Sequence, residues 1–292
     1  MSAMPHQGSF LLGLIGYGIQ GSLTPSLHER EGAEQGLKVI YKLVDLQKLG
    51  LDVTALPELL LAAERMGFAG LNITFPCKQE IIPLLTDLSD NARALGAVNT
   101  VVVRDERRFG HNTDLFGYAE NLRRGLPDVK RDRVVQVGAG GAGSAVAEAL
   151  MQLGVQTLTV FDTDAARAQH VAADLCARHG AGRAVAGSDL RGAIAEADGL
   201  VNTTPVGMAK LPGTPVPADF LRPALWVSEI IYFPLETELL KQARAIGCRT
   251  LDGGGMAVFQ AVRAFELFTG IKPDAERMRR HFDALRETAA TA

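Results

Sequence analysis

The sequence predicts an α/β protein of two domains, on the basis of its length, its alternating strand and helix patterns, and one glycine-rich turn. At 292 residues, the chain exceeds the size that one hydrophobic core usually serves. Short apolar runs that alternate with segments of helical periodicity indicate parallel-type sheets covered by helices. The glycine-rich turn lies between a strand and a helix in the second half of the chain. It predicts a Rossmann-like dinucleotide-binding domain there.

The first half of the chain contains four apolar, β-branched runs that read as strands and three segments with helical spacing. The predicted strands are residues 11–16, 38–44, 70–75 and 98–103, and the predicted helices are residues 25–35, 57–66 and 114–122. The following stretch, residues 123–133, is polar and contains Gly125 and Pro127. This composition suits a connection between domains.

The second half begins with a strand, a glycine-rich turn and a helix, which together form a βαβ pattern with the next strand. The predicted strands are residues 134–137, 157–161, 200–202, 226–231 and 249–251, and the predicted helices are residues 144–153, 165–179 and 256–269.

Composition disfavours several classes of partner. A net charge of −3 offers no basic surface for nucleic acid. The longest apolar stretches fall far short of the ~20 residues that a membrane-spanning helix needs, and the first ten residues lack the pattern of a secretory signal. Three widely spaced cysteines and six scattered histidines give no disulfide framework and no metal-ligand spacing. We therefore expect a cytoplasmic protein without a metal, which binds neither nucleic acid nor membrane.

The glycine-rich turn matches the pattern G-x-G-x-x-G at Gly138, Gly140 and Gly143. The first glycine permits a tight turn, the second lets the backbone approach a pyrophosphate, and the third allows the helix to pack on the strand. The phosphates would lie against the N–H groups at the start of the helix. A structural glycine turn is the alternative, but the strand before it and the helix after it favour dinucleotide binding.

An acidic residue ends the next strand and bears on the choice of cofactor. Asp162 lies about twenty residues past the loop, where a carboxylate can bind the adenine ribose hydroxyls and would repel a 2′-phosphate. Asp164 adds charge nearby, and Arg167 could stack on the adenine. These residues favour NAD over NADP. The alternative is that Asp162 and Asp164 only cap the helix that begins near residue 165.

Six segments of the sequence, taken in order, match motifs of one family. They are residues 21–25 (Gly-Ser-Leu-Thr-Pro), 72–78 (Asn-Ile-Thr-Phe-Pro-Cys-Lys), 96–100 (Gly-Ala-Val-Asn-Thr), 110–114 (Gly-His-Asn-Thr-Asp), 202–208 (Asn-Thr-Thr-Pro-Val-Gly-Met) and 255–260. The chain thereby resembles the shikimate dehydrogenase family over nearly its whole length. It is most similar to the NAD-using quinate/shikimate dehydrogenases, because Thr24 stands where the biosynthetic enzymes usually carry Ser, and Phe161-Asp-Thr-Asp164 stands where they usually carry a basic cluster.

The resemblance implies a hydride transfer between NAD and a ring hydroxyl of quinate or shikimate. Lys78 and Asp114 match the family's acid/base pair. The residues implied for the substrate are Ser22, Thr24, Thr74, Asn99, Tyr232 and Gln260. Those implied for the cofactor are Gly138, Ala139, Gly140, Gly141 and Ala142 of the glycine-rich turn, together with Asp162, Arg167, Thr203, Thr204, Pro205, Ile230 and Gly255. We expect residues 1–120 to form the substrate domain, completed by helices in residues 256–292, and residues 121–255 to form the NAD-binding domain of a monomer or homodimer.

Purely structural roles and other functions are alternatives to these assignments. Lys78 could be a surface lysine, Asp114 a helix cap, Ser22 and Thr24 capping residues, and Asn99 and Gln260 partners of buried backbone groups. One rival function is an NADP-dependent biosynthetic shikimate dehydrogenase, and a rival of another class is a catalytically silent cofactor-binding regulator. The substrate could also be another cyclic compound, such as an amino-substituted relative of shikimate, because a fold does not fix a substrate.

Overall fold

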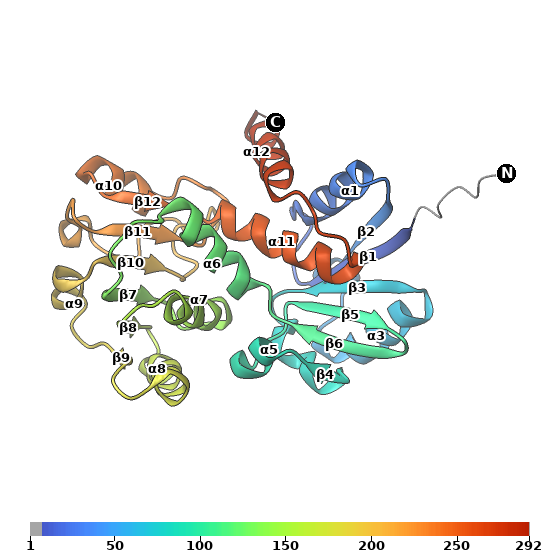
Figure 1. Ribbon diagram of the computed structural model, residues 1–292, viewed down its shortest axis with the longest axis horizontal. Helices are drawn as coiled ribbons and strands as arrows, with labels where there is room; N and C mark the ends of the chain where they lie inside the picture. Colours follow the sequence, from blue (N-terminus) through green and yellow to red (C-terminus); the bar gives the residue numbers. More distant parts are fainter. Residues whose placement is uncertain (1–7, 292) are drawn as a thin grey trace. The chain divides into compact units, whose positions relative to one another are not determined.

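The computed structural model describes residues 8–291 and divides the chain into two compact units (Figure 1). Unit 1 contains the residues up to Thr113 and those from Gln260 onward, and unit 2 is Asp114–Phe259. Unit 1 is therefore discontinuous in sequence. No helix within residues 8–291 has both the length and the apolar character needed to cross a membrane.

The unit boundaries differ from the predicted ones, which followed residues 120 and 255. The helix α6, Asp114–Gly125, packs against α7, Gly141–Gln152, and so belongs to unit 2 from its first residue. The polar stretch 123–133 is not a connection between domains. It ends α6 and leads into β7, Arg133–Val137, within unit 2.

Unit 1 is built on a six-stranded sheet in the order β2-β1-β3-β5-β6-β4. The strands β1, β2 and β3 are parallel, as predicted, whereas β5 runs antiparallel to both β3 and β6. The sheet is therefore mixed. Its elements, in chain order, are β1 (Ser9–Gly16), α1 (Thr24–Glu34), β2 (Lys38–Asp45), α2 (Leu46–Leu49), η1 (Val53–Ala55), α3 (Leu56–Arg65), β3 (Phe68–Ile73), α4 (Cys77–Glu80), η2 (Ile82–Leu84), β4 (Asp87–Leu88), α5 (Asp90–Leu95), β5 (Thr100–Arg104) and β6 (Arg107–His111).

Two helices from the end of the chain complete unit 1. They are α11, Gly254–Thr269, whose residues from Gln260 onward lie in this unit, and α12, Ala275–Thr291. Phe268 packs so closely on β3 that a Cβ on Gly70 would lie 2.2 Å from its ring. Arg277 of α12 donates to the buried carboxylate of Glu31 in α1. Both ends of the chain therefore contribute to the core and to the polar contacts of unit 1.

Unit 2 contains a six-stranded parallel sheet in the order β12-β11-β10-β7-β8-β9. This is the strand order of the doubly wound Rossmann fold, in which ligands bind at the carboxyl ends of the strands where the order reverses. That position lies between β7 and β10. The remaining elements are β8 (Thr157–Phe161), α8 (Ala165–His179), β9 (Ala184–Ala186), α9 (Leu190–Glu196), β10 (Gly199–Asn202), η3 (Ala218–Phe220), β11 (Trp226–Glu229), α10 (Glu238–Ile246) and β12 (Arg249–Leu251).

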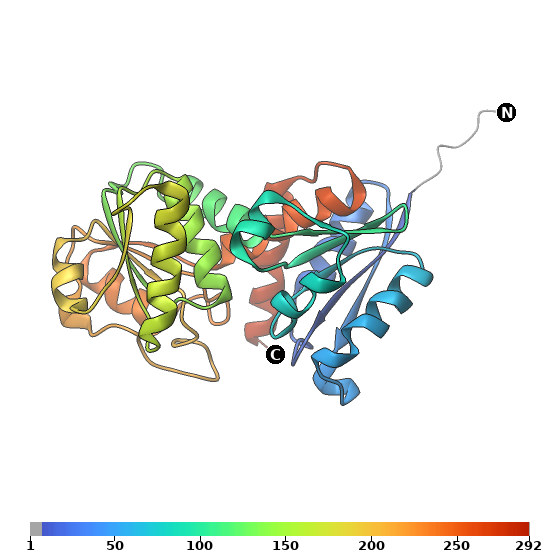
Figure 2. The ribbon, with the colours of Figure 1, turned by 90° about the horizontal axis from the view of Figure 1, so that it is seen from below.

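Helices cover both faces of this sheet. Figure 2 shows the green and yellow-green helices α7 and α8 on one face, where they contact β7 and β8. On the other face, α9 and α10 share a core with strand residues Val135, Leu200 and Val227, all 2% exposed or less. Apolar side chains thus project from both sides of the strands, which is why these strands read as continuous hydrophobic runs.

Candidate active site

The glycine loop after β7 has backbone geometry that requires glycine at two of its three motif positions. Gly138 has φ of +107°, and a Cβ there would lie 2.8 Å from the backbone carbon of Thr203. A Cβ on Gly143 would lie 2.6 Å from the carbonyl oxygen of Gly138. In contrast, a Cβ on Gly140 would meet no atom within 4 Å. Packing within the protein therefore explains why glycine is needed at positions 138 and 143, but it does not explain glycine at position 140.

The exposed part of the loop fits a pyrophosphate. Gly140 is the N-cap of the 12-residue helix α7, and Gly141 is its first residue; both are exposed, whereas Ala139 is buried. The N–H groups of a first helical turn have no partner within the helix, and together with the helix dipole they favour an anion. A ligand could approach the backbone at Gly140 and Gly141 because no side chain of either residue stands in the way.

Asp162 follows β8 and is bonded to the glycine loop. Its Oδ2 accepts a hydrogen bond from the backbone N–H of Ala139 at 2.7 Å, and its Oδ1 accepts one from Asp164 N–H at 2.9 Å. Burial acts to raise the pKa of Asp162, but these hydrogen bonds and the Arg167 guanidinium hold it below its usual value. The carboxyl group is therefore ionised at neutral pH and fixed beside the loop.

The two acidic residues after β8 have different roles. Asp164 is the N-cap of α8, and its Oδ1 accepts a hydrogen bond from Ala166 N–H at 3.0 Å. The side chain of Arg167 is 63% exposed and lies 3.4 Å from Asp164 Oδ2. The capping alternative thus holds for Asp164, while Asp162 contacts the glycine loop.

The loop after β10 lies on the other side of the strand reversal and also contacts the glycine loop. Thr203 Oγ1 donates to the carbonyl oxygens of Gly138 at 2.7 Å and Val137 at 3.0 Å. Thr204 Oγ1 donates to Asn202 Oδ1 at 2.7 Å, and Pro205 is exposed. The hydroxyl of Thr203 therefore supports the glycine loop, and Thr204 and Pro205 form the accessible part of this segment.

The segment after β11 approaches the same edge of the sheet. Ile230 is partly buried and Tyr232 is 45% exposed. A Cβ on Gly253 would lie 2.3 Å from the carbonyl oxygen of Ile230, so this glycine allows the start of α11 to pack on the segment. Gly255, two residues later, is buried within α11. Every predicted cofactor residue therefore belongs to a segment that follows β7, β8, β10, β11 or β12 in unit 2.

In unit 1, the predicted substrate hydroxyls lie side by side at the start of α1. Ser22 Oγ donates to Thr24 Oγ1 at 3.1 Å, and Ser22 Oγ also accepts the N–H of Thr24 at 3.3 Å. The N-cap position itself belongs to Leu23, without a side-chain cap. Asp45 at the end of β2 holds the preceding turn, because its carboxylate accepts the N–H groups of Gly18 at 2.8 Å and Ile19 at 3.1 Å.

A buried polar network surrounds the predicted residue Asn99. Asn99 Oδ1 accepts the N–H of Thr113 at 2.7 Å, so Asn99 does satisfy a buried backbone group. Thr113 Oγ1 lies 3.4 Å from Gln260 Oε1 of α11. Asn72 Nδ2 donates to the carbonyl oxygen of Asn99 at 3.3 Å, and Asn72 Oδ1 accepts from the hydroxyl of Tyr41 at 2.7 Å. Residues from four separate parts of unit 1 thus fix the position of Asn99.

The predicted catalytic residues lie in the first turns of two helices, α4 and α6. Lys78 is partly buried in α4, and its carbonyl oxygen accepts the N–H of Val98 at 2.8 Å. Thr74, between β3 and α4, donates its N–H to Ile15 of β1 at 2.9 Å. Asp114 is 8% exposed at the first residue of α6, directly after Thr113. In unit 1, Ser22, Thr74 and Asn99 all lie at the edge of the sheet where β1 and β3 end and β5 begins.

Three buried polar residues lie near the dinucleotide-binding edge, of which sequence reasoning missed Gln136 and Glu229 and noted Asn202 only as part of a motif. Gln136 of β7 donates to the carbonyl oxygens of both Gly138 and Gly143, at 2.8 and 2.9 Å. Asn202 and Glu229 end β10 and β11 and are bonded to each other. The signal of Gln136 and Glu229 in the sequence is a polar residue within or ending an apolar strand, which is too common to identify a site. No cluster of metal-ligating side chains occurs in the described part of the chain.

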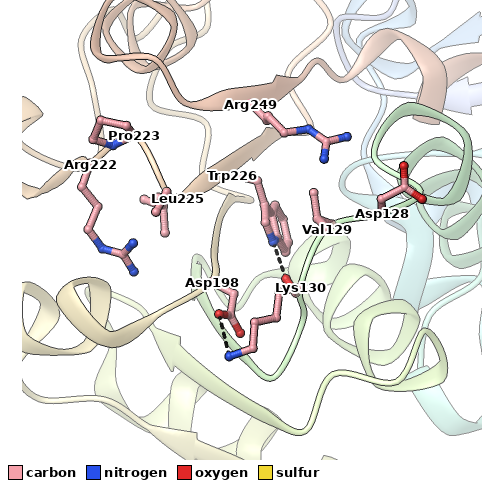
Figure 3. Close-up of a pocket in the computed structure, with 10 residues that line it drawn as sticks. Asp128, Val129, Lys130, Asp198, Arg222, Pro223, Leu225, Trp226 and Arg249 are labelled. Atoms are coloured by element: carbon pink, nitrogen blue, oxygen red, sulfur yellow. Dashed lines mark hydrogen bonds and ion pairs between the residues drawn. The ribbon is translucent and has the colours of Figure 1, made fainter.

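A cavity of about 330 Å³ lies at the opposite edge of the same sheet, where β10, β11 and β12 begin. Figure 3 shows Trp226 donating to the carbonyl oxygen of Lys130, and Lys130 pairing with Asp198. These contacts engage Trp226, Lys130 and Asp198 with one another. Ligands of doubly wound sheets bind at the carboxyl ends of the strands, so this cavity is not the candidate site.

The fold and the loops at this edge define the class of α/β proteins that contain a Rossmann dinucleotide-binding unit. Residues 14–101 match the model of the shikimate dehydrogenase substrate binding domain, and residues 253–281 match that of the shikimate 5'-dehydrogenase C-terminal domain. Residues 116–180, which include the glycine loop, match the ThiF family.

The sequence is similar to those of related proteins over almost its whole length. A shikimate dehydrogenase (NADP(+)) of Streptomyces avermitilis is 55% identical over 97% of this chain and 98% of its own. A quinate/shikimate dehydrogenase (NAD(+)) of Corynebacterium efficiens is 53% identical over 95% of this chain and 99% of its own. The structure of quinate dehydrogenase from Corynebacterium glutamicum in complex with NAD is similar, with a TM-score of 0.90, 49% identity and coverage of 95% and 99%. The chain belongs to the shikimate dehydrogenase family.

Proposed function

We propose that the protein is an NAD-dependent quinate/shikimate dehydrogenase, which oxidises a ring hydroxyl to give 3-dehydroquinate or 3-dehydroshikimate. The observation that carries the choice of NAD is the ionised carboxylate of Asp162, held against the glycine loop. A carboxylate there can accept hydrogen bonds from the ribose hydroxyls of NAD and repels the 2′-phosphate of NADP. Overall identity does not decide, because NADP-named and NAD-named relatives are 55% and 53% identical to the chain.

The cofactor is proposed to lie along the carboxyl edge of the sheet in unit 2. The pyrophosphate would lie on the backbone of residues 138–142 at the start of α7, and Arg167 would stack on the adenine. Thr204, Pro205 and Ile230 would lie toward the nicotinamide, with Gly255 close to the ring. When bound, NAD supplies the acceptor for the hydride that leaves the carbinol carbon.

The substrate carboxylate is proposed to bind at the start of α1. The hydroxyls of Ser22 and Thr24 lie 3.1 Å apart, and each can donate a hydrogen bond to a carboxylate oxygen. The dipole of the 11-residue helix also favours an anion there. Thr74, Asn99, Gln260 and Tyr232 offer neutral donors and acceptors for the ring hydroxyls.

Lys78 and Asp114 are proposed to act as the acid/base pair. Oxidation removes a hydride from the carbinol carbon and a proton from its hydroxyl oxygen, so the enzyme must provide an acceptor for that proton. The amine of Lys78 would accept it, and the carboxylate of Asp114 would hold the reacting hydroxyl and share the proton. In the reverse direction the same amine would return the proton to the carbonyl oxygen. We further propose that the protein works in the cytoplasm as a monomer or homodimer.

Initial rates with purified protein test this proposal. Quinate or shikimate would be combined with NAD or NADP, and formation of the reduced nicotinamide would be followed by its absorbance. NAD-linked oxidation of quinate is the expected result. Activity on shikimate only with NADP would establish the biosynthetic enzyme instead. Dinucleotide binding without turnover in any combination would favour the silent regulator.

A further inference from the structure

Glu229 is a fully buried carboxyl group at the end of β11, with an exposed fraction of 0%. It accepts hydrogen bonds at both oxygens from neutral donors. Oε1 accepts the N–H groups of Ile230 at 2.9 Å and Ile231 at 3.1 Å, and Oε2 accepts the hydroxyl of Thr237 at 3.2 Å. The amide of Asn202 donates to Oε1 at 3.1 Å and to Oε2 at 2.9 Å. The described part of the chain provides no cation that pairs with this carboxylate.

The donors belong to two loops that face the dinucleotide-binding edge. Asn202 ends β10, and its Oδ1 accepts both the N–H of Thr204 at 2.9 Å and the hydroxyl of Thr204 at 2.7 Å. Asn202 Nδ2 also donates to the carbonyl oxygen of Val206 at 3.1 Å. Ile230 and Ile231 begin the loop after β11, and Thr237 is the N-cap of α10 at its end. Glu229 therefore accepts hydrogen bonds from both loops, which are also joined by the N–H of Ile230 and the carbonyl oxygen of Asn202 at 3.3 Å.

Burial of a carboxyl group without a cationic partner costs free energy, which indicates that Glu229 has a role beyond packing. Burial raises the pKa of Glu229 to about 7, even though five hydrogen bonds to its oxygens act to lower it. An apolar side chain at the end of β11 would avoid this penalty. Glu148 of α7, which is 4% exposed, differs because it is paired with Arg178 at 3.1 Å and with His179 at 2.9 Å.

We propose that Glu229 is a positioning residue, which fixes the loops after β10 and β11 in the arrangement that receives the nicotinamide half of the dinucleotide. The inference rests on the proposed cofactor site. Glu229 acts through Asn202 and Thr204 on one loop and through the N–H groups of Ile230 and Ile231 on the other. The adenosine half would depend on different contacts, those of Asp162 and the glycine loop, and Thr203, which joins this loop to the segment after β10, is bonded to Val137 and Gly138 and not to Glu229.

Glutamine cannot reproduce this set of bonds, although it has nearly the same shape. Its single oxygen could accept the N–H groups of Ile230 and Ile231, but its NH₂ group would then face the NH₂ group of Asn202. Rotation of the Asn202 amide would relieve this conflict and would remove Oδ1 from Thr204. The Glu229→Gln variant therefore disturbs the loop after β10 without creating a cavity.

The test compares binding of two ligands by titration calorimetry. NADH probes the whole dinucleotide site, and ADP-ribose lacks the nicotinamide. In Glu229→Gln, we expect Kd for NADH to rise on the order of tenfold, as loss of a buried hydrogen-bond network predicts. Kd for ADP-ribose should stay at the wild-type value. A merely structural role for Glu229 would weaken both ligands alike, and this result would overturn the proposal.

Glu148→Gln is the matched control, because it neutralises another buried carboxylate of the same unit. It should lower the melting temperature and leave both Kd values unchanged. If Glu229→Gln does not fold, Glu229→Asp keeps two acceptor oxygens on a shorter side chain and should show the same selective loss for NADH. An unchanged Kd for NADH in the folded variant rejects the role of Glu229 alone. Failure of the wild-type protein to bind either NADH or NADPH would reject the proposed function as well.

Discussion

The carboxylate of Asp162 accepts a hydrogen bond from the backbone N–H of Ala139, with an N···O distance of 2.7 Å. The residue that we propose to bind the ribose therefore also helps to hold the loop that would bind the pyrophosphate. Its other oxygen accepts the N–H of Asp164 at 2.9 Å. Because the two contacts involve different oxygens, substitutions at residue 162 can separate the charge from the hydrogen bonds.

Asp162→Asn should relax the selection against NADP. The amide keeps one oxygen that can accept the N–H of Ala139, but it no longer repels a 2′-phosphate. We expect the ratio of kcat/KM for NAD to that for NADP to fall on the order of tenfold. Asp162→Ala should also weaken NAD, because it loses the bond to the loop. An unchanged ratio in both variants would contradict the role of Asp162.

Asp164→Ala is the control for this prediction. Asp164 caps α8 through Ala166 N–H, so its loss should cost about 1 kcal/mol of stability. The coenzyme ratio should remain that of the wild type, as measured by the same initial rates.

Alanine at Gly140 should lower dinucleotide affinity, whereas alanine at Gly143 should lower the stability of the protein. A Cβ at Gly140 meets no atom within 4 Å, so Gly140→Ala should fold normally but lose dinucleotide affinity through contact with the pyrophosphate. A Cβ at Gly143 lies 2.6 Å from the carbonyl oxygen of Gly138, so Gly143→Ala should lose about 1 to 3 kcal/mol of stability. Melting temperatures and calorimetric Kd values distinguish the two. Normal NADH binding by Gly140→Ala would argue against the proposed pyrophosphate site.

Lys78→Met should reduce turnover far more than cofactor binding. Removal of a general base typically costs about 10² to 10⁴ in rate, whereas the amine is not proposed to contact the dinucleotide. Lys42→Met provides the control, since Lys42 is an exposed lysine on β2. The measurements are kcat with saturating substrate and Kd for NADH. Wild-type turnover by Lys78→Met would rule out the assignment.

Glu229 should make the stability of unit 2 fall as the pH rises from about 4.5 to about 7. The folded protein keeps the proton up to a pKa of about 7, whereas the unfolded chain releases it near 4.5. The native state therefore binds more protons within this window, and the loss amounts to about 3 kcal/mol. Urea unfolding can be followed by the single tryptophan, Trp226, which is buried on the same strand. The stability difference between wild type and Glu229→Gln should shrink across this window, and a constant difference would contradict the raised pKa.

Much of the fold could be predicted because hydrophobic periodicity reports burial directly. The helix at residues 165–179 and the strands at 157–161 and 249–251 have the predicted bounds. The strand β6, Arg107–His111, was missed because it begins with two charged residues, directly after a tight turn at Asp105 and Glu106, both with positive φ. The first unit boundary was misplaced because the polar end of α6 resembles a linker, and only its packing on α7 assigns it to unit 2.

The candidate site could be predicted only where a residue belongs to a motif. Gly138, Gly143 and Asp162 were singled out as candidates because they belong to a strand, loop and helix pattern with a fixed spacing. Asp45, Gln136 and Glu229 act by long-range hydrogen bonds, and their partners cannot be identified without the fold. Asn99 shows the intermediate case, because its motif indicated a site but not its bond to Thr113.

The discontinuity of unit 1 bears on how the protein forms during synthesis. The first 113 residues leave the ribosome long before the partners that cover them, since Phe268 and Arg277 follow the whole of unit 2. At typical translation speeds the delay is on the order of ten seconds. During that time, the surface of β3 around Gly70 and the carboxylate of Glu31 lack their native contacts. The N-terminal segment therefore acquires its last native contacts only after the whole of unit 2 has been synthesised.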